Sequence, residues 1–172
     1  MRFILLLFSW SLCSCGNTIY IVRHAEKEPA PASATGMMTS DPPLSENGRI
    51  RAYALRERLR HEHIMYIFST NTTRTISTAQ PLNEFRGRTN IELYSSKKDS
   101  MDLFIGRLNR IKRGNVLVVG HSNTVDDLVN KLCGKTVLPG DLKDTEYDNL
   151  YIIKRRGGRY SFKNGKYGVR TE

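Results

Sequence analysis

Short apolar runs alternate with longer helix-favouring stretches along most of this chain, and this alternation limits the fold more than any other feature. The apolar runs are rich in β-branched and aromatic residues and predict strands at residues 18–22, 64–69, 90–94 and 115–120. The longer stretches predict helices at residues 45–60, 72–85, 101–112 and 123–133. Such alternation favours a sheet covered by helices on both faces. We therefore expect an α/β fold, a three-layer α/β/α sandwich with a mostly parallel sheet.

Two local signals refine this expectation. Ser45 precedes the first helix and is suited to cap its N-terminus. The apolar face of that helix is expected to comprise Ile50, Tyr53, Ala54, Leu55 and Leu59. Near the end of the chain, Gly157-Gly158 separates the strand-like residues 149–155 and 159–163. This pattern predicts a β-hairpin, which we place at an edge of the sheet.

The first fifteen residues, M-R-F-I-L-L-L-F-S-W-S-L-C-S-C, combine one arginine, an apolar run and small residues, as in a secretory signal peptide. The run is shorter than the roughly 20 residues that span a bilayer. Its end, L-C-S-C, resembles the lipobox of bacterial lipoproteins. We therefore expect a signal peptide at residues 1–14, lipidation of Cys15, and a single domain at residues 15–172. Such a domain would be anchored to a membrane in the bacterial cell envelope, periplasmic or surface-facing. The alternative is a buried first strand.

The net charge of the chain indicates which classes of partner it favours. It has 27 Lys and Arg against 17 Asp and Glu, a net charge of +10, which favours anionic partners such as phosphate esters, acidic lipid or nucleic acid. The basic residues are scattered and are not interleaved with aromatic residues, as a stacking surface for bases would require. We therefore expect no nucleic-acid binding.

Polar and cationic residues follow three of the predicted strands. Arg23-His24 comes after the first, S-T-N-T-T-R-T (69–75) after the second, and G-H-S-N (120–123) after the fourth. In open parallel sheets, ligands bind outside the carboxyl ends of the strands. Two arginines and two histidines gathered there would form a pocket for a tetrahedral dianion such as phosphate.

Four segments resemble the ordered motifs of the histidine phosphatase superfamily, which has the phosphoglycerate mutase-like fold. They are R-H-A-E (23–26), L-S-E-N-G-R-I-R-A (44–52), S-T-N-T-T-R-T-I-S-T-A (69–79) and V-V-G-H-S-N-T (118–124). Each alone has a structural explanation, for example a strand-end histidine or a solvated arginine. Four motifs in the right order, spread over residues 18–133, favour the resemblance.

The resemblance implies a role for each matched residue. His24 would be the nucleophile and would carry the phosphoryl group covalently. Arg23 and Arg74 would bind the phosphoryl oxygens, and His121 would complete the catalytic set. Ser122 and Asn123 would add substrate-binding donors. The resemblance implies no metal ion and no cofactor.

The general acid does not match the family pattern. One branch has Asp directly after the second histidine, where this chain has Ser122, and the other has a Glu in a region that here offers none in a clear loop position. The candidates are Glu26, Asp99 and Glu92, together with Glu28 and Asp41 if the first loop folds over the pocket. The gap resembles the small phosphohistidine phosphatases, which lack this acid.

We therefore expect a metal-independent hydrolase, similar to histidine acid phosphatases, that cleaves phosphomonoesters through a phosphohistidine on His24. Its partners would be a phosphorylated small molecule or a phosphoprotein, and a membrane through the lipid anchor. Two alternatives remain open: a phosphohistidine protein phosphatase, and a non-catalytic phosphate-binding lipoprotein.

Overall fold

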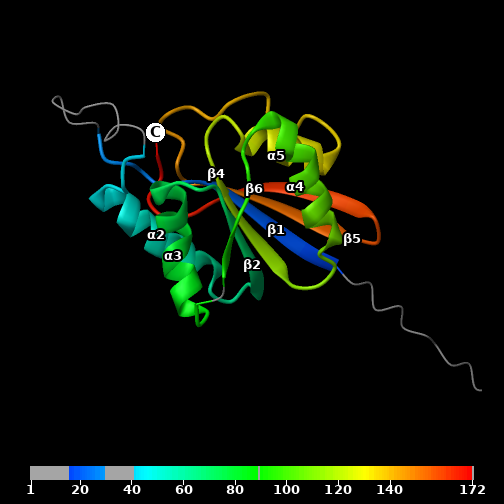
Figure 1. Cartoon of the computed structure of the whole chain (residues 1–172), viewed down its shortest axis with the longest axis horizontal. Coiled ribbons are helices and arrows are strands. Elements are labelled where there is room, and N and C mark those ends of the chain that lie inside the picture. The colour runs from blue at the N-terminus through cyan, green and yellow to red at the C-terminus, as the bar shows by residue number, and fades with distance from the viewer. Residues whose placement is uncertain (1–15, 30–40, 89, 172) are drawn as a thin grey trace, which may run out of the picture.

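A computed structural model describes residues 16–29, 41–88 and 90–171 (Figure 1). The expected signal peptide and Cys15 lie outside the described residues. Within them, no helix has both the length and the apolar character needed to cross a membrane. The strands are β1 (Gly16–Arg23), β2 (Ile64–Ser69), β3 (Ile91–Leu93), β4 (Asn115–Gly120), β5 (Asn149–Arg156) and β6 (Arg159–Lys166). The helices are α2 (Glu46–Leu59), α3 (Thr73–Phe85), α4 (Lys98–Arg110) and α5 (Val125–Cys133).

The six strands form one sheet in the order β3-β2-β4-β1-β5-β6. The pairs β3–β2, β2–β4 and β4–β1 are parallel, whereas β5 runs antiparallel to β1 and forms an edge hairpin with β6. The expected α/β fold, its mostly parallel sheet and the hairpin are thus confirmed. The order places β1 and β4 side by side with β2 next to β4, so the ends of these three strands are neighbours.

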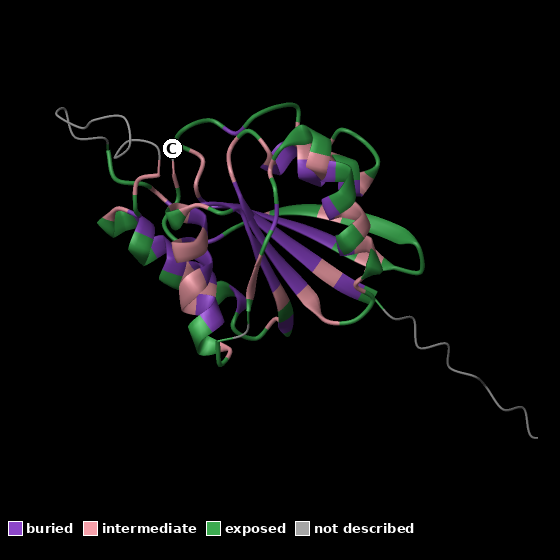
Figure 2. Cartoon of the chain, in the orientation of Figure 1, coloured by how far each residue is buried: buried purple, intermediate pink, exposed green. Residues whose placement is uncertain are grey.

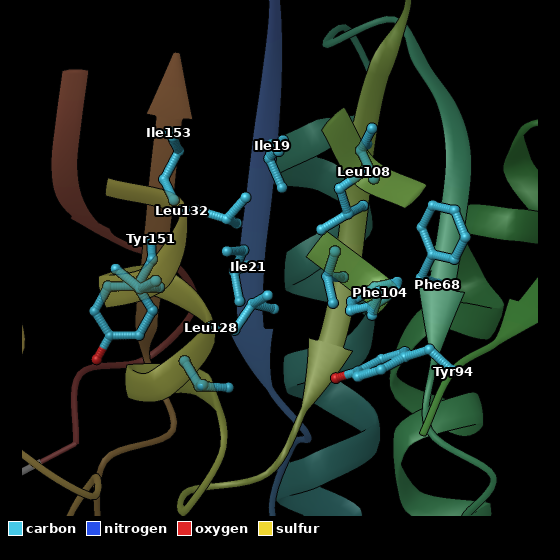
Figure 3. Close-up of a cluster of buried hydrophobic side chains, with 14 of the residues drawn as sticks. Ile19, Ile21, Phe68, Tyr94, Phe104, Leu108, Leu128, Leu132, Tyr151 and Ile153 are labelled. Carbon is cyan, nitrogen blue, oxygen red and sulfur yellow. The ribbon is translucent and has the colours of Figure 1, made fainter. Parts of the chain in front are cut away.

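Alternate strand residues pack against different helices, which makes the molecule three-layered. Ile19, Ile21, Val116 and Val118 belong to a core that includes Phe104 and Leu108 of α4 and Leu128 and Leu132 of α5 (Figure 3). Their neighbours along the strands, Tyr20, Val22, Leu117 and Val119, belong to a second core with Leu55 and Leu59 of α2 and Ala79 and Leu82 of α3. The central strands β1 and β4 are therefore buried on both faces (Figure 2).

Helix α2 begins as expected, since the side chain of Ser45 accepts a hydrogen bond from the Gly48 backbone N–H at 3.2 Å. The expected apolar face of α2 is partly wrong. Ile50 and Tyr53 are about half exposed, whereas Arg51, which we did not place on the buried face, is 5% exposed. Arg51 points inward because hydrogen-bond acceptors and a carboxylate lie there.

Arg51 links three parts of the chain that are distant in sequence. Its guanidinium binds the carboxylate of Glu26, with Nη2 to Oε1 at 2.7 Å, and donates through Nη1 to the carbonyl oxygens of Tyr167 and Val169. Burial would lower the pKa of Arg51, but the hydrogen bonds and charge of Glu26 raise it. Arg51 thus ties the segment after β1 and the C-terminal residues to α2.

Helix α2 packs closely against the segment after β1, and this close approach explains why residue 48, in the second motif, is a glycine. A Cβ atom at Gly48 would lie 2.0 Å from the backbone oxygen of Glu26, which is far inside van der Waals contact. The same oxygen accepts a hydrogen bond from the Ser45 backbone N–H at 3.0 Å. The residues that follow His24 are therefore held rigidly against the start of α2.

We predict that Arg51→Ala lowers the free energy of unfolding by about 3 kcal/mol, because Glu26 is left partly buried without its cation. The matched control is Arg49→Ala on the same helix. Arg49 also pairs with a glutamate, Glu46, but both side chains are mostly exposed, so we expect a loss below about 1 kcal/mol. Urea denaturation of both variants measures the difference. Equal losses would show that the Arg51 link does not stabilise the fold.

Candidate active site

A pocket of about 530 Å³ lies at the carboxyl ends of β1, β2 and β4. It contains all four residues expected to be catalytic and both residues expected to bind substrate. Its lining is Arg23, His24, Lys27, Arg74, Ser96, Lys97, His121, Ser122, Asn123, Thr124 and Asp144. The structure therefore brings the three polar strand ends together, as the parallel sheet requires.

His24 follows β1 directly and is 4% exposed. Its backbone N–H donates to the Gly120 carbonyl of β4 at 2.9 Å, so the strand pairing itself fixes its position. The ring Nδ1 lies 2.8 Å from the carbonyl oxygen of Ala25, which can only accept a hydrogen bond. In the neutral ring the proton is therefore on Nδ1, and Nε2 keeps a free lone pair.

His121 follows β4, and its ring centroid lies 5.5 Å from that of His24. Its Nε2 is 2.9 Å from Thr70 Oγ1, which donates in turn to Thr75 Oγ1 at 3.0 Å. Its Nδ1 is 3.5 Å from Nη2 of Arg74, a group that can only donate. This network assigns the proton of the neutral ring to Nε2 and turns the Nδ1 lone pair toward Arg74.

Arg23 is 5% exposed and is held by the loop before β5. Its Nη1 donates to the Lys143 carbonyl at 2.8 Å, its Nη2 to Tyr147 Oη at 3.3 Å, and its guanidinium carbon lies 4.1 Å from the centre of the Tyr147 ring. The side chain of Asp144 is 3.7 Å away. The Nε atom is buried with no hydrogen-bond partner among the described residues. Protein acceptors thus leave this guanidinium incompletely satisfied.

Arg74 lies in the first turn of α3 and donates through Nη1 to Asp41 Oδ1 at 3.1 Å. Asp41 also accepts hydrogen bonds from the backbone N–H and the hydroxyl of Thr73, and so provides an acceptor for an N–H group in the first turn of α3. Burial would raise the pKa of Asp41, but these hydrogen bonds and the charge of Arg74 lower it. Asp41 is thus a carboxylate that holds Arg74 in place.

Burial and charge keep both histidines neutral. The pKa of His24 is lowered to about 3, first by desolvation and then by Arg23, Arg74 and His121, against the Ala25 hydrogen bond, which raises it. The pKa of His121 is lowered to about 4, first by desolvation and then by Arg74 and Arg23. Near neutral pH the pocket therefore presents two uncharged imidazoles between two guanidinium groups.

The three carboxylates expected as general acids do not line the pocket. Glu26 binds Arg51 on the α2 side, because that arginine is buried against it. Glu92 lies on β3 and pairs with Arg107 of α4. Asp99 lies exposed in the first turn of α4, two residues beyond Lys97. Of the two first-loop residues considered, Glu28 is exposed outside the pocket lining and Asp41 is bound to Arg74.

Three charged residues of this lining, Lys27, Lys97 and Asp144, and the neighbouring Tyr147 were not predicted from the sequence. Lys27 and Lys97 are exposed cations on the pocket wall, and Asp144 is the one carboxylate among the described lining residues. Tyr147 stacks on Arg23. Lys27 adjoins R-H-A-E and could have been noticed. The other three lie in loops that only the folded chain brings to the strand ends.

Among the described residues, no group of three or more His, Cys, Asp or Glu side chains is arranged to hold a metal ion. The pocket lining instead combines hydrogen-bond donors with positive charge: two guanidinium groups, two lysines, and the side chains of Ser122, Asn123 and Thr124. Forked guanidinium groups and neutral donors suit a phosphoryl group.

The sequence model of the histidine phosphatase superfamily (branch 1) matches residues 19–96. No curated protein is significantly similar in sequence. Solved structures with the same fold include a phosphoglycerate mutase from Bacillus anthracis, with TM-score 0.60 and 20% identity over 88% of this chain and 93% of that one. A structure assigned as the phosphohistidine phosphatase SixA of Agrobacterium tumefaciens has TM-score 0.61 and 18% identity over 85% and 96%.

A phosphoserine phosphatase from Entamoeba histolytica, in complex with 3-phosphoglyceric acid, has TM-score 0.62 and 13% identity over 90% of this chain and 98% of that one. At these identities the likeness shows the fold. The phosphoglycerate mutase-like architecture is thus confirmed, and the chain spans nearly the whole length of these structures.

We predict that the ring resonances of His24 and His121 remain those of neutral imidazole from about pH 8 down to about pH 5, because both pKa values lie well below 6.5. NMR of the free protein labelled at histidine measures this, with His24→Ala and His121→Ala for assignment. The Nδ1–H tautomer of His24 should also be visible in the nitrogen shifts. Protonation of either ring near pH 6.5 would show that burial and the two arginines do not lower the pKa of that histidine.

Proposed function

We propose that the chain is a hydrolase of the histidine phosphatase superfamily (branch 1), whose sequence model matches residues 19–96, and that it cleaves phosphomonoesters through a phosphohistidine on His24. One observation carries the proposal. His24 is a buried, neutral imidazole whose free Nε2 lone pair lies in a pocket with Arg23, Arg74 and His121. A nucleophile needs this combination of lone pair, fixed orientation and neighbouring positive charge.

In the first step, Nε2 of His24 attacks phosphorus. A P–N bond forms while the P–O ester bond breaks, and the leaving oxygen takes the electron pair of the broken bond. The ring of the phosphohistidine keeps its proton on Nδ1 and becomes cationic. The Ala25 carbonyl, already 2.8 Å from Nδ1, then accepts a stronger, charge-assisted hydrogen bond.

Arg23 and Arg74 bind the phosphoryl oxygens and stabilise the charge that is redistributed during transfer. His121 is neutral in the free protein, and its unprotonated Nδ1 cannot donate a hydrogen bond to an anion. A bound dianion favours the protonated ring, because opposite charge raises the pKa of an imidazole. We therefore propose that His121 becomes protonated when the substrate binds.

In the second step, water attacks the phosphorus of phospho-His24. The P–N bond breaks, its electron pair returns to Nε2, and inorganic phosphate leaves. Both steps use only side chains, backbone and water, so the proposed reaction is metal-independent. Ser122 and Asn123, which also line the pocket, are proposed as substrate-binding donors.

The absence of a buried carboxylic acid from the described pocket lining supports a second function. An alkoxide leaving group benefits from a positioned acid, whereas a phenolate or an imidazole needs less help. Asp144, the one carboxylate of that lining, is fully exposed and faces Arg23. Phosphohistidine in a protein is therefore a substrate that this pocket favours over alkyl phosphates. A non-catalytic phosphate-binding lipoprotein is the third possibility.

We propose that residues 15–172 form one domain tethered in the bacterial cell envelope through Cys15, after removal of residues 1–14. The support is the sequence alone: the apolar run, the small residues after it, and L-C-S-C. The partners in this proposal are a phosphorylated small molecule or phosphoprotein and the membrane.

We predict that the protein hydrolyses an aryl phosphate in the presence of a chelator and that His24→Ala lowers kcat by at least about 10³-fold, because the nucleophile is lost. The matched control, His63→Ala, removes an exposed histidine outside the pocket and should leave kcat unchanged. Steady-state assays with aryl and alkyl phosphates measure both effects and the aryl preference. Tight phosphate binding without turnover of either ester or of phosphohistidine would instead indicate a binding protein.

We predict that Lys97 raises affinity for substrates with a second anionic group. Lys97→Ala should raise KM for carboxyphenyl phosphate roughly two- to fivefold more than KM for phenyl phosphate, since an exposed ion pair is lost. Lys98→Ala is the control, because Lys98 is also exposed but lies outside the pocket lining. If the two variants change KM alike, or if neither distinguishes the two esters, Lys97 does not select substrates.

A further inference from the structure

Two segments of the chain lack acidic residues entirely. Residues 103–125 contain only Arg107, Arg110, Lys112 and Arg113 as charged groups. Residues 149–171 contain Lys154, Arg155, Arg156, Arg159, Lys163, Lys166 and Arg170, again without Asp or Glu. Positive charge is therefore concentrated at the end of α4, in the loop that follows it, and in the β5–β6 hairpin.

Arg155 joins these two segments at one end of the sheet. Its Nε donates to Asn17 Oδ1 at 2.8 Å, its Nη1 to the Leu108 carbonyl at 3.0 Å and its Nη2 to the Ile111 carbonyl at 2.6 Å. The hairpin turn, the end of α4 and the start of β1 thus meet, as Figure 1 shows. At the same place Gly16 pairs with Arg156, so β1 begins beside this hairpin.

Five other cations at this end have no acidic partner among the described residues. We name the exposed residues Lys112, Arg113, Lys154, Arg156 and Arg159, with Tyr160, the basal cationic surface. None of its five cations forms an ion pair with another described residue, in contrast to Lys166, which binds Asp148. Glu62, in the loop beside Asn115, is already engaged by Tyr20 and Arg58. The hairpin turn is fully exposed in Figure 2.

The basal cationic surface lies at the opposite end of the sheet from the pocket. Strand β1 starts beside it at Gly16 and ends at Arg23, next to His24 in the pocket. Eight residues of strand span roughly 25 Å. A ligand on the basal surface is therefore too far away to touch the pocket.

We propose that the basal cationic surface binds the anionic headgroups of a lipid bilayer and orients the domain with its pocket facing away from the membrane. Unpaired Lys and Arg side chains are attracted to acidic lipid, and Tyr160 is an amphipathic residue of the kind found at the headgroup level. The surface adjoins the point where the chain continues to the apolar N-terminal run and Cys15. A cationic surface and an acyl chain together anchor a protein more stably than one alone. The inference does not depend on the proposed catalysis.

The test measures binding of the chain from Gly16 to Glu172 to lipid vesicles. This part contains all six strands and both hydrophobic cores, so it has what it needs to fold without residues 1–15. Co-sedimentation compares phosphatidylcholine vesicles with vesicles that also contain about one third phosphatidylglycerol. We expect binding only to the anionic vesicles and release by salt.

Arg156→Glu/Arg159→Glu should weaken vesicle binding at least about tenfold. The control, Lys98→Glu/Arg170→Glu, changes the net charge equally at exposed positions outside the basal surface and should weaken binding less than about twofold. Circular dichroism and thermal melts verify that both variants fold. Equal weakening by the two pairs would overturn the proposal, since net charge alone would then explain binding. So would the absence of binding, or tighter binding to RNA or DNA that displaces the vesicles.

A fluorescence experiment tests the orientation. The chain from Gly16 contains no tryptophan, because the single Trp is Trp10. Tyr160→Trp should show a blue-shifted emission when anionic vesicles are added, as the indole enters the headgroup region. Tyr53→Trp, at a similarly exposed position on α2, should not shift. A shift at Tyr53→Trp, or none at Tyr160→Trp, would show that the domain does not dock through the hairpin.

Discussion

The site depends on one constraint, the parallel pairing of β1 with β4. The register that pairs Arg23 with Gly120, together with the bond from the His24 N–H to the Gly120 carbonyl, makes the two strands end at the same level. Each strand is followed at once by a histidine, so two imidazoles with no sequence proximity lie 5.5 Å apart between their centroids. The adjacent pairing of β2 with β4 adds Thr70, in the loop after β2, and Arg74, in the first turn of α3. The chemistry of the pocket follows from the sheet register.

Electrostatics then determine what this geometry can do. Burial favours neutral imidazoles, and the two arginines favour them further, so both histidines are uncharged in the free protein. The arginines are themselves held by neutral or acidic groups: carbonyls and Tyr147 around Arg23, and Asp41 beside Arg74. These contacts fix the two guanidinium groups before a substrate binds, which is the preorganisation that phosphoryl transfer requires. The five cations of the basal cationic surface, at the opposite end of the sheet, form no ion pair with another described residue, and we assign them to a membrane surface instead.

Much of the fold could be predicted because the local and tertiary preferences agree. The apolar runs at residues 64–69 and 115–120 coincide with β2 and β4, and Ser45 caps α2. The errors arose where a tertiary contact overrides the local pattern. Arg51 is buried in place of Ile50 because Glu26 and the C-terminal carbonyls receive it, and no periodicity encodes partners more than 100 residues away. The same contact removed Glu26 from the pocket. Lys97, Asp144 and Tyr147 come from loops, whose positions the strand pattern does not specify.

The central claim is that His24 carries the phosphoryl group, and trapping that intermediate tests it most directly. The protein is mixed with an aryl phosphate labelled at phosphorus, quenched within milliseconds at alkaline pH, digested, and analysed for labelled peptides. Our account predicts an acid-labile label on the peptide that contains His24, with none in His24→Ala. Turnover without a labelled enzyme, or a label on a serine, cysteine or carboxylate peptide, would contradict it.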